Sequence, residues 1–213
     1  MGNPTLTVGI DIGTTSVKAV AATGDGTIVR RARVVHALRA PSPHVFEHDP
    51  VAAWRDGVLA AWSAVGGDEV AAVTVSAMVP SLCGVDGDGT PVTAGLLYGD
   101  ARGRERTGAG DAGGVSGEIV GFARALRGET GVVGLWPAQA VANHALCGVA
   151  AIDTATAMTA MPLFDGVGWD ATLCDDLGVD PDALPGLSPG AAAIGSVGIG
   201  ESGEALVLSL IHI

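Results

Sequence analysis

The stretch Gly9–Val20, GIDIGTTSVKAV, constrains the fold of this chain more than any other feature. It overlaps an apolar run, Leu6–Ile10, that has the pattern of a short buried β-strand, and Asp11 stands where this strand ends. Gly13 and the hydroxyl residues Thr14–Ser16 follow at once, which is the composition of a tight turn. The sequence therefore predicts a strand that delivers a carboxylate and three hydroxyls to one bend.

Two more strands are predicted after this bend. The apolar residues 17–22 form the first, the turn-forming residues 23–26 (TGDG) end it, and residues 27–35 form the second. Consecutive strands joined by short turns form a β-meander. A strand, and not a helix, therefore follows the hydroxyl-rich bend. Neither GxxxxGK[ST] nor GxGxxG occurs there, so this is not a strand-loop-helix phosphate site.

The bend has the chemistry of a polyphosphate site. Small residues let the backbone approach a phosphate, hydroxyls and backbone N–H groups donate hydrogen bonds, and a carboxylate binds Mg²⁺ directly or through water. We therefore predict ATP and Mg²⁺ as cofactors, with Asp11 as the metal ligand. The residues predicted to bind the cofactor are Asp11, Gly13, Thr14, Thr15 and Lys18. The alternative is an ordinary Gly/Thr hairpin with an exposed aspartate.

Charge and composition exclude several classes of protein. The 213 residues are 48% hydrophobic, enough for a sizeable core, and 11 Lys plus Arg against 23 Asp plus Glu give a net charge of −12. Such a surface repels nucleic acid and anionic membranes, whereas a neutral small molecule is unaffected. ATP would approach against this field, so its site must be compensated locally. We expect no nucleic-acid or membrane partner.

The cysteines and the apolar stretches indicate a cytoplasmic protein. Cys83, Cys147 and Cys174 are odd in number and far apart, which favours buried thiols in a reducing compartment over disulfides or a zinc site. The longest apolar stretch, residues 138–152, is interrupted by polar side chains and is not expected to span a membrane. No signal peptide is recognised.

A helix is predicted from Pro50 to about Val65. Asp49 is a good N-cap and proline suits the first helical position. Gly66 and Gly67 end the helix. Apolar residues share one face at helical spacing, which predicts core packing: Val51, Trp54, Val58, Leu59 and Trp62. We favour a structural role for Asp49, as a helix cap, over a role as a metal or substrate ligand.

A second buried strand is predicted at Glu69–Ser76, because its apolar residues are mostly β-branched and do not alternate with polar ones. It leads into the loop Met78–Ser81, and a further strand, Leu82–Val85, follows. The run Asp86–Gly89, DGDG, lacks the ligand spacing and the final Glu of an EF-hand, so it is interpreted as a turn.

With these elements in order, the chain resembles a known superfamily. The hairpin resembles the first phosphate-binding hairpin of actin, hexokinase and the sugar kinases, and its continuation at Ser16 and Lys18 resembles the FGGY carbohydrate kinases. A second FGGY element, E-x-D-P-x-x-x-W, matches at Glu47, Asp49, Pro50 and Trp54, with His48 where the family often has Gln. The resemblance implies an α/β fold: a ribonuclease H-like (actin-like ATPase) domain whose mixed central β-sheet is flanked by helices.

The resemblance also implies a sugar site. The FGGY pattern [WY]-x-D-x-R matches at Tyr98, Asp100 and Arg102, where a ring, a carboxylate and a guanidinium suit a polyol. The alternative is that Asp100 caps the following helix and that the arginines are its solvated face. We favour substrate binding for Tyr98 and Asp100, and the solvated face for Arg104 and Arg106.

Substrate contacts are also predicted for Met78 and Ser81. Xylulokinases resemble this chain but carry Gln-Met-His-Gly at the four positions Met78–Ser81, so Pro80 replaces the histidine. The Arg-Glu pair of glycerol kinases is missing as well. We therefore expect D-xylulose to be a poor substrate, and the sugar and the phosphorylated hydroxyl stay open.

The later segments are assigned mainly to structure. Helices are predicted at 115–126 and 136–146, with His144 in the core, and a strand at 191–197. Asp153, Thr156 and Ala157 match the family's D-x-x-T-A segment, which lies near the sugar in the family. The segment that begins at Trp169 resembles the family pattern W-D-x-x-L-x-x-x-L-G. Trp169 and Leu173 are one helical turn apart, which predicts a short buried helix.

The end of the chain lacks an expected residue. In the family, a later aspartate takes the proton of the sugar hydroxyl, and the resemblance places it beyond residue 213, so no catalytic residue is predicted and the fragment is expected to be inactive. Residues 208–213, LSLIHI, equal the translation of a transposon-end sequencing adapter. We expect residues 1–207 to form an incomplete N-terminal, sugar-binding FGGY domain and 208–213 to be a non-native tail.

The predicted function is that of a carbohydrate kinase, a phosphotransferase with an alcohol acceptor, which phosphorylates a sugar or polyol with ATP. The full-length protein could form a homodimer. Two alternatives stay open: a non-catalytic sugar-binding or regulatory module, and a heat-shock-type ATPase chaperone, which shares GIDxGTT but lacks the later elements.

Overall fold

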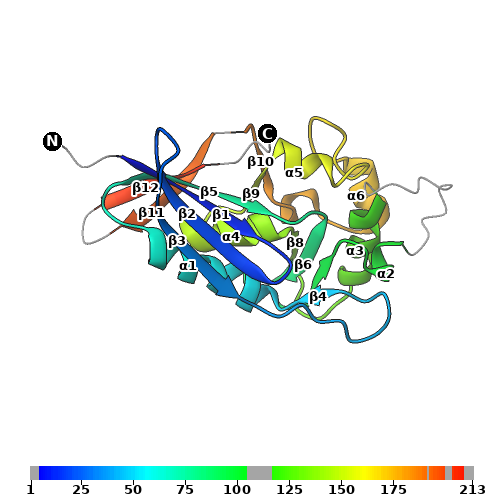
Figure 1. Cartoon of the computed structure of the whole chain (residues 1–213). Coiled ribbons are helices and arrows are strands. Elements are labelled where there is room, and N and C mark those ends of the chain that lie inside the picture. Colours follow the sequence, from blue (N-terminus) through cyan, green and yellow to red (C-terminus); the bar gives the residue numbers. More distant parts are fainter. Residues whose placement is uncertain (1–4, 105–116, 191, 200–202, 209–213) are drawn as a thin grey trace.

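A six-stranded mixed sheet with the strand order β11-β12-β5-β1-β2-β3 forms the centre of the fold (Figure 1). The computed structural model describes residues 5–104, 117–190, 192–199 and 203–208. The strands are β1 Leu6–Ile12, β2 Ser16–Thr23, β3 Ile28–Val35, β5 Val70–Ala77, β11 Ala193–Ile199 and β12 Gly203–Leu208. The predicted meander, the buried strand that follows it and the strand near residue 195 are confirmed.

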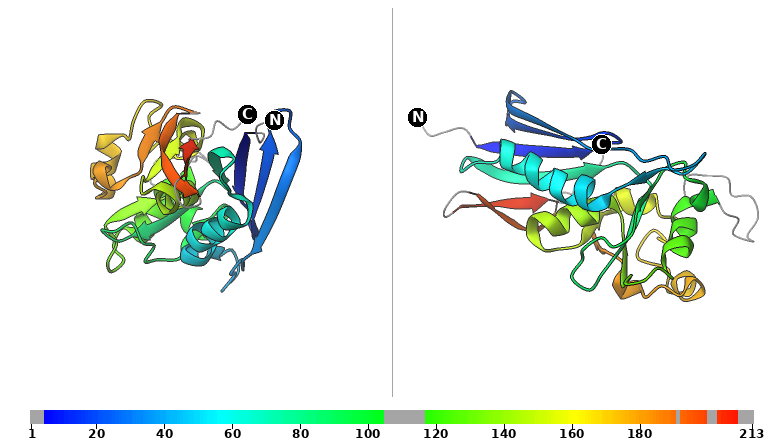
Figure 2. Two further views of the ribbon diagram at one scale, coloured as in Figure 1. Left: turned by 90° about the vertical axis from the view of Figure 1, so that its left-hand side faces the viewer. Right: turned by 90° about the horizontal axis from the view of Figure 1, so that it is seen from below.

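The meander presents two different faces. On β2, Val17, Ala19 and Ala21 are buried while Lys18 is exposed. This alternation is expected of a strand with one face on a core. In the left-hand view of Figure 2, the blue strands β1–β3 form an outer wall, and the helices lie on one side of it. The exposed residues of β1–β3 therefore belong to a sheet face that no described helix covers.

The parallel pairing of β1 with β5 fixes the register of the sheet. Asp11, near the end of β1, is the register partner of Ser76, near the end of β5. The connection between the two strands carries β4 Glu47–His48, the π-helical turn η1 Val51–Asp56 and helix α1 Gly57–Val65. A crossover of this kind is required between parallel strands. It brings the carboxyl ends of β1 and β5 to the same edge.

The predicted helix after Pro50 is present but begins as a π-helical turn. The carboxylate of Asp49 accepts a hydrogen bond from the Ala52 N–H at 3.1 Å, so Asp49 caps this turn as predicted. Gly66 follows the last residue of α1. The main core lies between the sheet and helices α1 and α4, Ala138–Cys147.

Trp54 occupies the centre of this core and is fully buried. Its indole lies directly against Gly95, the first residue of β7 Gly95–Leu97. A Cβ atom added at Gly95 would lie 2.3 Å from the indole Cη2, which is well inside van der Waals contact. The absence of a side chain at Gly95 therefore makes room for the tryptophan.

A second, smaller layer packs at the end of the main sheet. It contains the four-stranded sheet β4-β7-β6-β8 and the two-stranded sheet β10-β9. A separate apolar core holds it together, with Leu96, Phe122, Ile152 and Phe164 among its buried members. The remaining elements are β6 Ser81–Val85, β8 Gly134–Trp136, β9 Ala151–Asp153, β10 Gly186–Ser188, α2 Ala101–Arg104, α3 Glu118–Leu126, α5 Thr154–Met158, α6 Ala171–Leu177 and the 3₁₀ turn η3 Pro181–Ala183.

Two predicted helix boundaries are wrong. Trp136 belongs to strand β8, which pairs with β6, and α4 begins only after Pro137. Trp169 precedes α6, because Asp170 caps that helix by accepting from the Leu173 N–H at 2.8 Å. In both cases a tryptophan that fits helical spacing packs from a neighbouring strand or loop.

Other expectations meet the structure as follows. Residues 86–89 form the predicted turn, and Cys83, Cys147 and Cys174 are free, with Cys147 only half-buried. Helix α3 covers the later part of the predicted 115–126 helix. Residues 115 and 116 lie outside the described residues, as do Arg106 and the tail residues 209–213. Strand β12, which extends to Leu208, was not predicted. Among the described residues, no helix has the length and hydropathy required to span a bilayer.

The close approach of Trp54 to Gly95 makes a stability prediction. Gly95→Ala should lower the free energy of unfolding by about 1–3 kcal/mol, because the added methyl overpacks a buried ring that has no room to move. Urea unfolding monitored by circular dichroism measures this. Gly87→Ala is the matched control, since nothing lies within 4 Å of a Cβ at Gly87. Equal stability of the two variants would contradict the account of this core.

Candidate functional site

The predicted cofactor residues meet at one bend between β1 and β2. The Gly13 N–H donates to the Ser16 carbonyl at 3.1 Å, and this closes the bend. A Cβ atom at Gly13 would lie 3.3 Å from the same oxygen, so the bend favours glycine there. Thr14 and Thr15 are exposed at its tip, and Asp11 is exposed beside it. The bend therefore presents hydroxyls and a carboxylate to solvent.

Two cations stand next to Asp11 on the uncovered face of the sheet. Lys18 of β2 is the register partner of Asp11, and Arg33 of β3 is the register partner of Lys18. All three side chains are exposed. The Arg33 Nε–H also donates to the Ser16 hydroxyl at 3.2 Å. In a chain of net charge −12, this row supplies local positive charge where an anion would bind. Arg33 was not predicted, because only the pairing of β3 reveals its position.

Two histidines lie beneath the bend. His48 is fully buried, and its Nε2 lies 2.8 Å from the carbonyl of Thr14. The indole N–H of Trp54 donates to His48 Nδ1 at 3.0 Å. The ring of His36 packs edge-on against His48, with the ring centres 4.5 Å apart. Burial lowers the pKa of His48 to about 4, and burial lowers the pKa of His36 as well. His48 is therefore neutral at physiological pH.

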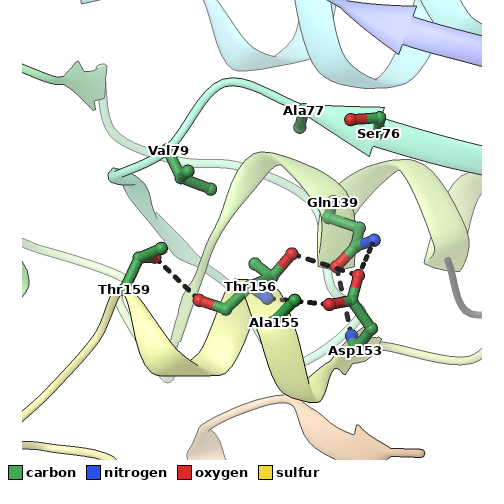
Figure 3. A pocket seen from close by; sticks show the side chains of 8 residues that line it. All are labelled: Ser76, Ala77, Val79, Gln139, Asp153, Ala155, Thr156 and Thr159. Atoms are coloured by element: carbon green, nitrogen blue, oxygen red, sulfur yellow. Dashed lines mark hydrogen bonds between the residues drawn. The ribbon is translucent and has the colours of Figure 1, made fainter. Parts of the chain in front are cut away.

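A small cavity lies at the carboxyl end of β5 (Figure 3). Its volume is about 150 Å³, and residues from β5, α4, β9 and α5, together with the loop after β5, line it. The lining combines apolar groups with hydroxyl, amide and carboxylate groups: Ser76, Ala77, Val79, Gln139, Asp153, Ala155, Thr156 and Thr159. Such a mixture suits a small polar ligand with C–H faces.

One wall of the cavity is a closed hydrogen-bond network. The buried carboxylate of Asp153 accepts from Gln139 Nε2 at 2.7 Å and from the Thr156 N–H at 2.7 Å. Gln139 Nε2 also donates to the carbonyl of Val75 at 2.9 Å, and the Asp153 N–H donates to Gln139 Oε1 at 3.2 Å. Figure 3 shows these side chains converging beneath the cavity. Because the network joins β5, α4 and α5, it fixes the shape of this wall.

The bend and the cavity lie at the same edge of the sheet. Asp11 and Ser76 are register partners on adjacent parallel strands, which lie about 4.8 Å apart. Ser76 lines the cavity, and Asp11 stands beside the bend. The arrangement therefore places a site suited to anions next to a site suited to a small neutral ligand.

The predicted residues Tyr98, Asp100 and Arg102 lie outside the cavity lining. Asp100 is fully buried and accepts hydrogen bonds from the Phe46 N–H at 2.7 Å and from the Arg102 N–H, Nε and Nη2 at 2.9, 2.8 and 2.7 Å. Despite its burial, hydrogen bonds and the charge of Arg102 hold the pKa of Asp100 below its usual value. Arg102 also pairs with Glu47 at 2.8 Å. Four bonds use the acceptor capacity of the carboxylate, so Asp100 caps α2, as in the structural alternative.

The remaining predicted substrate residues are also separate from the cavity. Ser81 is buried and its hydroxyl accepts from the Ala138 N–H at 3.1 Å, which caps the start of α4. Met78 is partly buried against the main core. Tyr98 is 57% exposed. A contact of Tyr98 with a sugar stays a prediction.

Four residues that line the cavity were not predicted as site residues: Val79, Gln139, Asp153 and Thr156. The D-x-x-T-A match, which includes Asp153 and Thr156, could have indicated these two from the sequence.

The site fits a magnesium ion that is bound mainly by the phosphates of a nucleotide and only in part by the protein. Among the described residues, no group of three or more His, Cys, Asp or Glu could hold a metal ion, and Asp11 forms no ion pair there. Mg²⁺ commonly keeps several waters and is bound through one or two carboxylates plus substrate phosphates. The exposed carboxylate of Asp11 beside a hydroxyl-rich bend has this character.

The fold is that of an actin-like domain of the sugar-kinase type, with a hydroxyl-rich hairpin bend beside a small cavity. Residues 6–108 match the family described as "FGGY family of carbohydrate kinases, N-terminal domain". The matched residues make up just under half of the chain, and the observed fold agrees with this match. No curated protein is significantly similar to the chain by sequence.

Solved structures share the fold over nearly the whole chain. Xylulose kinase from Rhodospirillum rubrum is 21% identical with a TM-score of 0.79, and the match covers 97% of this chain and 48% of that one. Gluconate kinase from Lactobacillus acidophilus is 18% identical with a TM-score of 0.76, and the match covers 96% of this chain and 47% of that one. Glycerol kinase from Plasmodium falciparum is 14% identical with a TM-score of 0.74, and the match covers 99% of this chain and 49% of that one. The predicted fold class is confirmed. The chain spans about half the length of these structures.

The buried histidines predict how stability depends on pH. The folded-state pKa of His48, about 4, lies below the unfolded value of 6.5, so the unfolded state binds more protons between these values. The free energy of unfolding should therefore fall as pH drops from about 6.5 to about 4, by on the order of 3 kcal/mol. Urea unfolding at a series of pH values measures this. His48→Gln should reduce the slope and leave only the smaller part that His36 contributes, whereas His144→Gln, on α4, should retain the whole slope. An unchanged slope in His48→Gln would contradict the assignment.

Proposed function

We propose that this chain is the sugar-binding, N-terminal part of an enzyme that transfers the γ-phosphoryl group of MgATP to a hydroxyl of a sugar or polyol. The observation that carries this proposal is the register pairing of Asp11 with Ser76. It sets the bend and the cavity side by side. The match of residues 6–108 to a family of carbohydrate kinases supports the same reaction class. Phosphoryl transfer depends mainly on positioning and charge stabilisation, which these two sites supply.

The bend would bind the phosphates of ATP. Hydroxyls of Thr14 and Thr15 are exposed to donate hydrogen bonds, and Lys18 and Arg33 would offset phosphate charge. Asp11 would hold Mg²⁺, which supplies charge neutralisation of the phosphates when bound. These roles require no rearrangement of the bend, since its backbone is already closed by the bond from the Gly13 N–H.

The cavity would bind the acceptor. Apolar groups of Ala77, Val79 and Ala155 can pack on the C–H face of a sugar. The Ser76 hydroxyl can bond a sugar hydroxyl, and Thr156 Oγ1, which donates to Asp153 at 3.2 Å, can accept from one. None of the described residues that line the cavity is cationic, and its one carboxylate would repel an anion. We therefore propose a neutral polyol or sugar as substrate and not a sugar acid.

We assign no general base to this chain. The related solved structures are about twice as long as the chain, and we propose that the base and the remainder of the nucleotide site lie in a part that corresponds to their other half. The 213 residues alone should then show no sugar phosphorylation. Turnover by the purified chain would contradict this division of roles.

The phosphate role of the bend is tested in the full-length protein. Asp11→Ala should lower kcat by at least about 100-fold, since it removes the anchor for the charge-neutralising ion, and Thr14→Ala should have a smaller effect. Asp25→Ala is the matched control, because Asp25 is exposed at the other turn of the same meander. A coupled ADP-release assay measures all three. Equally small effects of Asp11→Ala and Asp25→Ala would show that the bend is not the phosphate site.

The cavity is tested by removing one hydroxyl without changing the shape of the side chain. Thr156→Val should raise the KM for the sugar about tenfold, because a substrate hydroxyl loses a partner, and should leave the KM for MgATP unchanged. Thr154→Val, at the exposed start of α5, is the control and should change neither constant. Steady-state kinetics with each substrate varied in turn distinguish the two. A Thr156→Val enzyme with wild-type sugar kinetics would remove the cavity from the substrate site.

A further inference from the structure

A buried tryptophan–histidine pair contacts the bend from inside the protein. Trp54 Nε1–H donates to His48 Nδ1 at 3.0 Å, so Nδ1 carries the lone pair and the hydrogen of the neutral ring is on Nε2. Nε2 then donates to the carbonyl of Thr14 at 2.8 Å. Both side chains are fully buried. The order of donors and acceptors is therefore fixed along the line Trp54, His48, Thr14.

The carbonyl of Thr14 is held only through this pair within the described residues. Neighbouring parts of the bend have other supports: the Gly13 N–H donates to the Ser16 carbonyl and the His36 N–H to the Thr15 carbonyl, both at 3.1 Å. The amides of Thr14 and Thr15 donate to no described residue, and their side chains are exposed. The Thr14 and Thr15 carbonyls thus bond to groups of the protein, while the Thr14 and Thr15 side chains are exposed.

We infer that His48 is a positioning residue of the nucleotide site: held by Trp54, it fixes the Thr14 carbonyl and so orients the Thr14 and Thr15 amides and hydroxyls toward the phosphates. This inference rests on the proposed function of the bend. A backbone that is already fixed in its bound conformation loses no conformational freedom when the ligand binds, so this preorganisation favours binding. A buried carbonyl that lost its donor would shift toward another partner and rotate the adjacent amide.

The Trp136–His144 pair provides a matched control. Its rings are also arranged edge to face, 5.1 Å apart, but His144 lies on α4 and not beneath the bend. His48→Leu removes the donor to Thr14, while His48→Gln keeps an acceptor for Trp54 and a donor for the carbonyl. Trp54→Phe removes the indole N–H together with part of the ring volume and keeps an aromatic ring in the core.

The first measurement is steady-state kinetics of the full-length protein with MgATP and sugar varied separately. His48→Leu should raise the KM for MgATP at least about tenfold while the KM for the sugar changes less than about twofold. His48→Gln should restore the KM for MgATP to within about threefold, and His144→Leu should leave both constants unchanged. If His48→Leu fails to fold, Trp54→Phe should show the same selective rise to a smaller extent. Equal rises in both KM values, or no rescue by glutamine, would overturn the inference.

The second measurement does not depend on activity. Hydrogen exchange of the 213-residue chain, followed by NMR, reports the Gly13 and His36 amides, which are hydrogen-bonded within or against the bend. His48→Leu should speed exchange at these two amides at least about tenfold, and it should leave the Gly26 amide, at the other turn of the meander, unchanged. Unchanged exchange at Gly13 and His36 would overturn the positioning role. If exchange responds as expected but the wild-type enzyme phosphorylates no sugar, the proposed function fails and His48 keeps its structural hold on the bend without the nucleotide role.

Discussion

The parallel pairing of β1 with β5 is the constraint on which the candidate site depends. It aligns Asp11 with Ser76 at one edge of the sheet, although 64 residues separate them in the sequence. A parallel pair needs a crossover connection, and here the connection passes through β4, η1 and α1. The same segment that makes the crossover therefore supplies His48 and Trp54, which contact the bend from below. Topology and site are coupled through one stretch of chain.

Side-chain packing holds the residues that contact the bend and the cavity in place. Trp54 fills the main core beside Gly95 of β7, so the indole N–H that reaches His48 has a fixed position. The network of Gln139 and Asp153 ties the cavity wall to β5 in a similar way, through the carbonyl of Val75. Both halves of the site are thus attached to the sheet by buried polar groups that are hydrogen-bonded. Such groups are costly to leave without partners, so they favour one arrangement.

The local elements of the site could be predicted from the sequence, because they depend on neighbours in the chain. The hydroxyl-rich bend, the Asp49 cap and the buried strand before Ser76 all follow from short patterns. Hydrogen bonds to residues that are distant in the sequence could not be predicted in this way. Asp100 fits a sugar-binding pattern, yet its carboxylate is fully engaged by Phe46 and Arg102. Ser81 caps α4, which begins 57 residues later.

Helical spacing misled the prediction where a large side chain packs from outside the helix. Trp136 has the spacing of the following helix but pairs with Cys83 in a strand, because Pro137 separates it from α4. Arg33 and most of the cavity lining could not be predicted, since the position of Arg33 depends on strand register and the lining on the meeting of β5, α4 and α5. Sequence patterns predicted which residues meet at the bend, and the three-dimensional structure was required to find its neighbours.

The central claim is that the phosphate bend and the cavity form one site. Titration of the chain with ATP and Mn²⁺, a paramagnetic substitute for Mg²⁺, tests it directly through distance-dependent broadening of amide NMR signals. The account predicts that signals from Gly13–Ser16 and from Ser76 and Ala77 broaden together, while Gly26, at the other turn of the meander, stays sharp. Broadening at the bend with Ser76 and Ala77 unaffected, or broadening centred elsewhere on the chain, would contradict it.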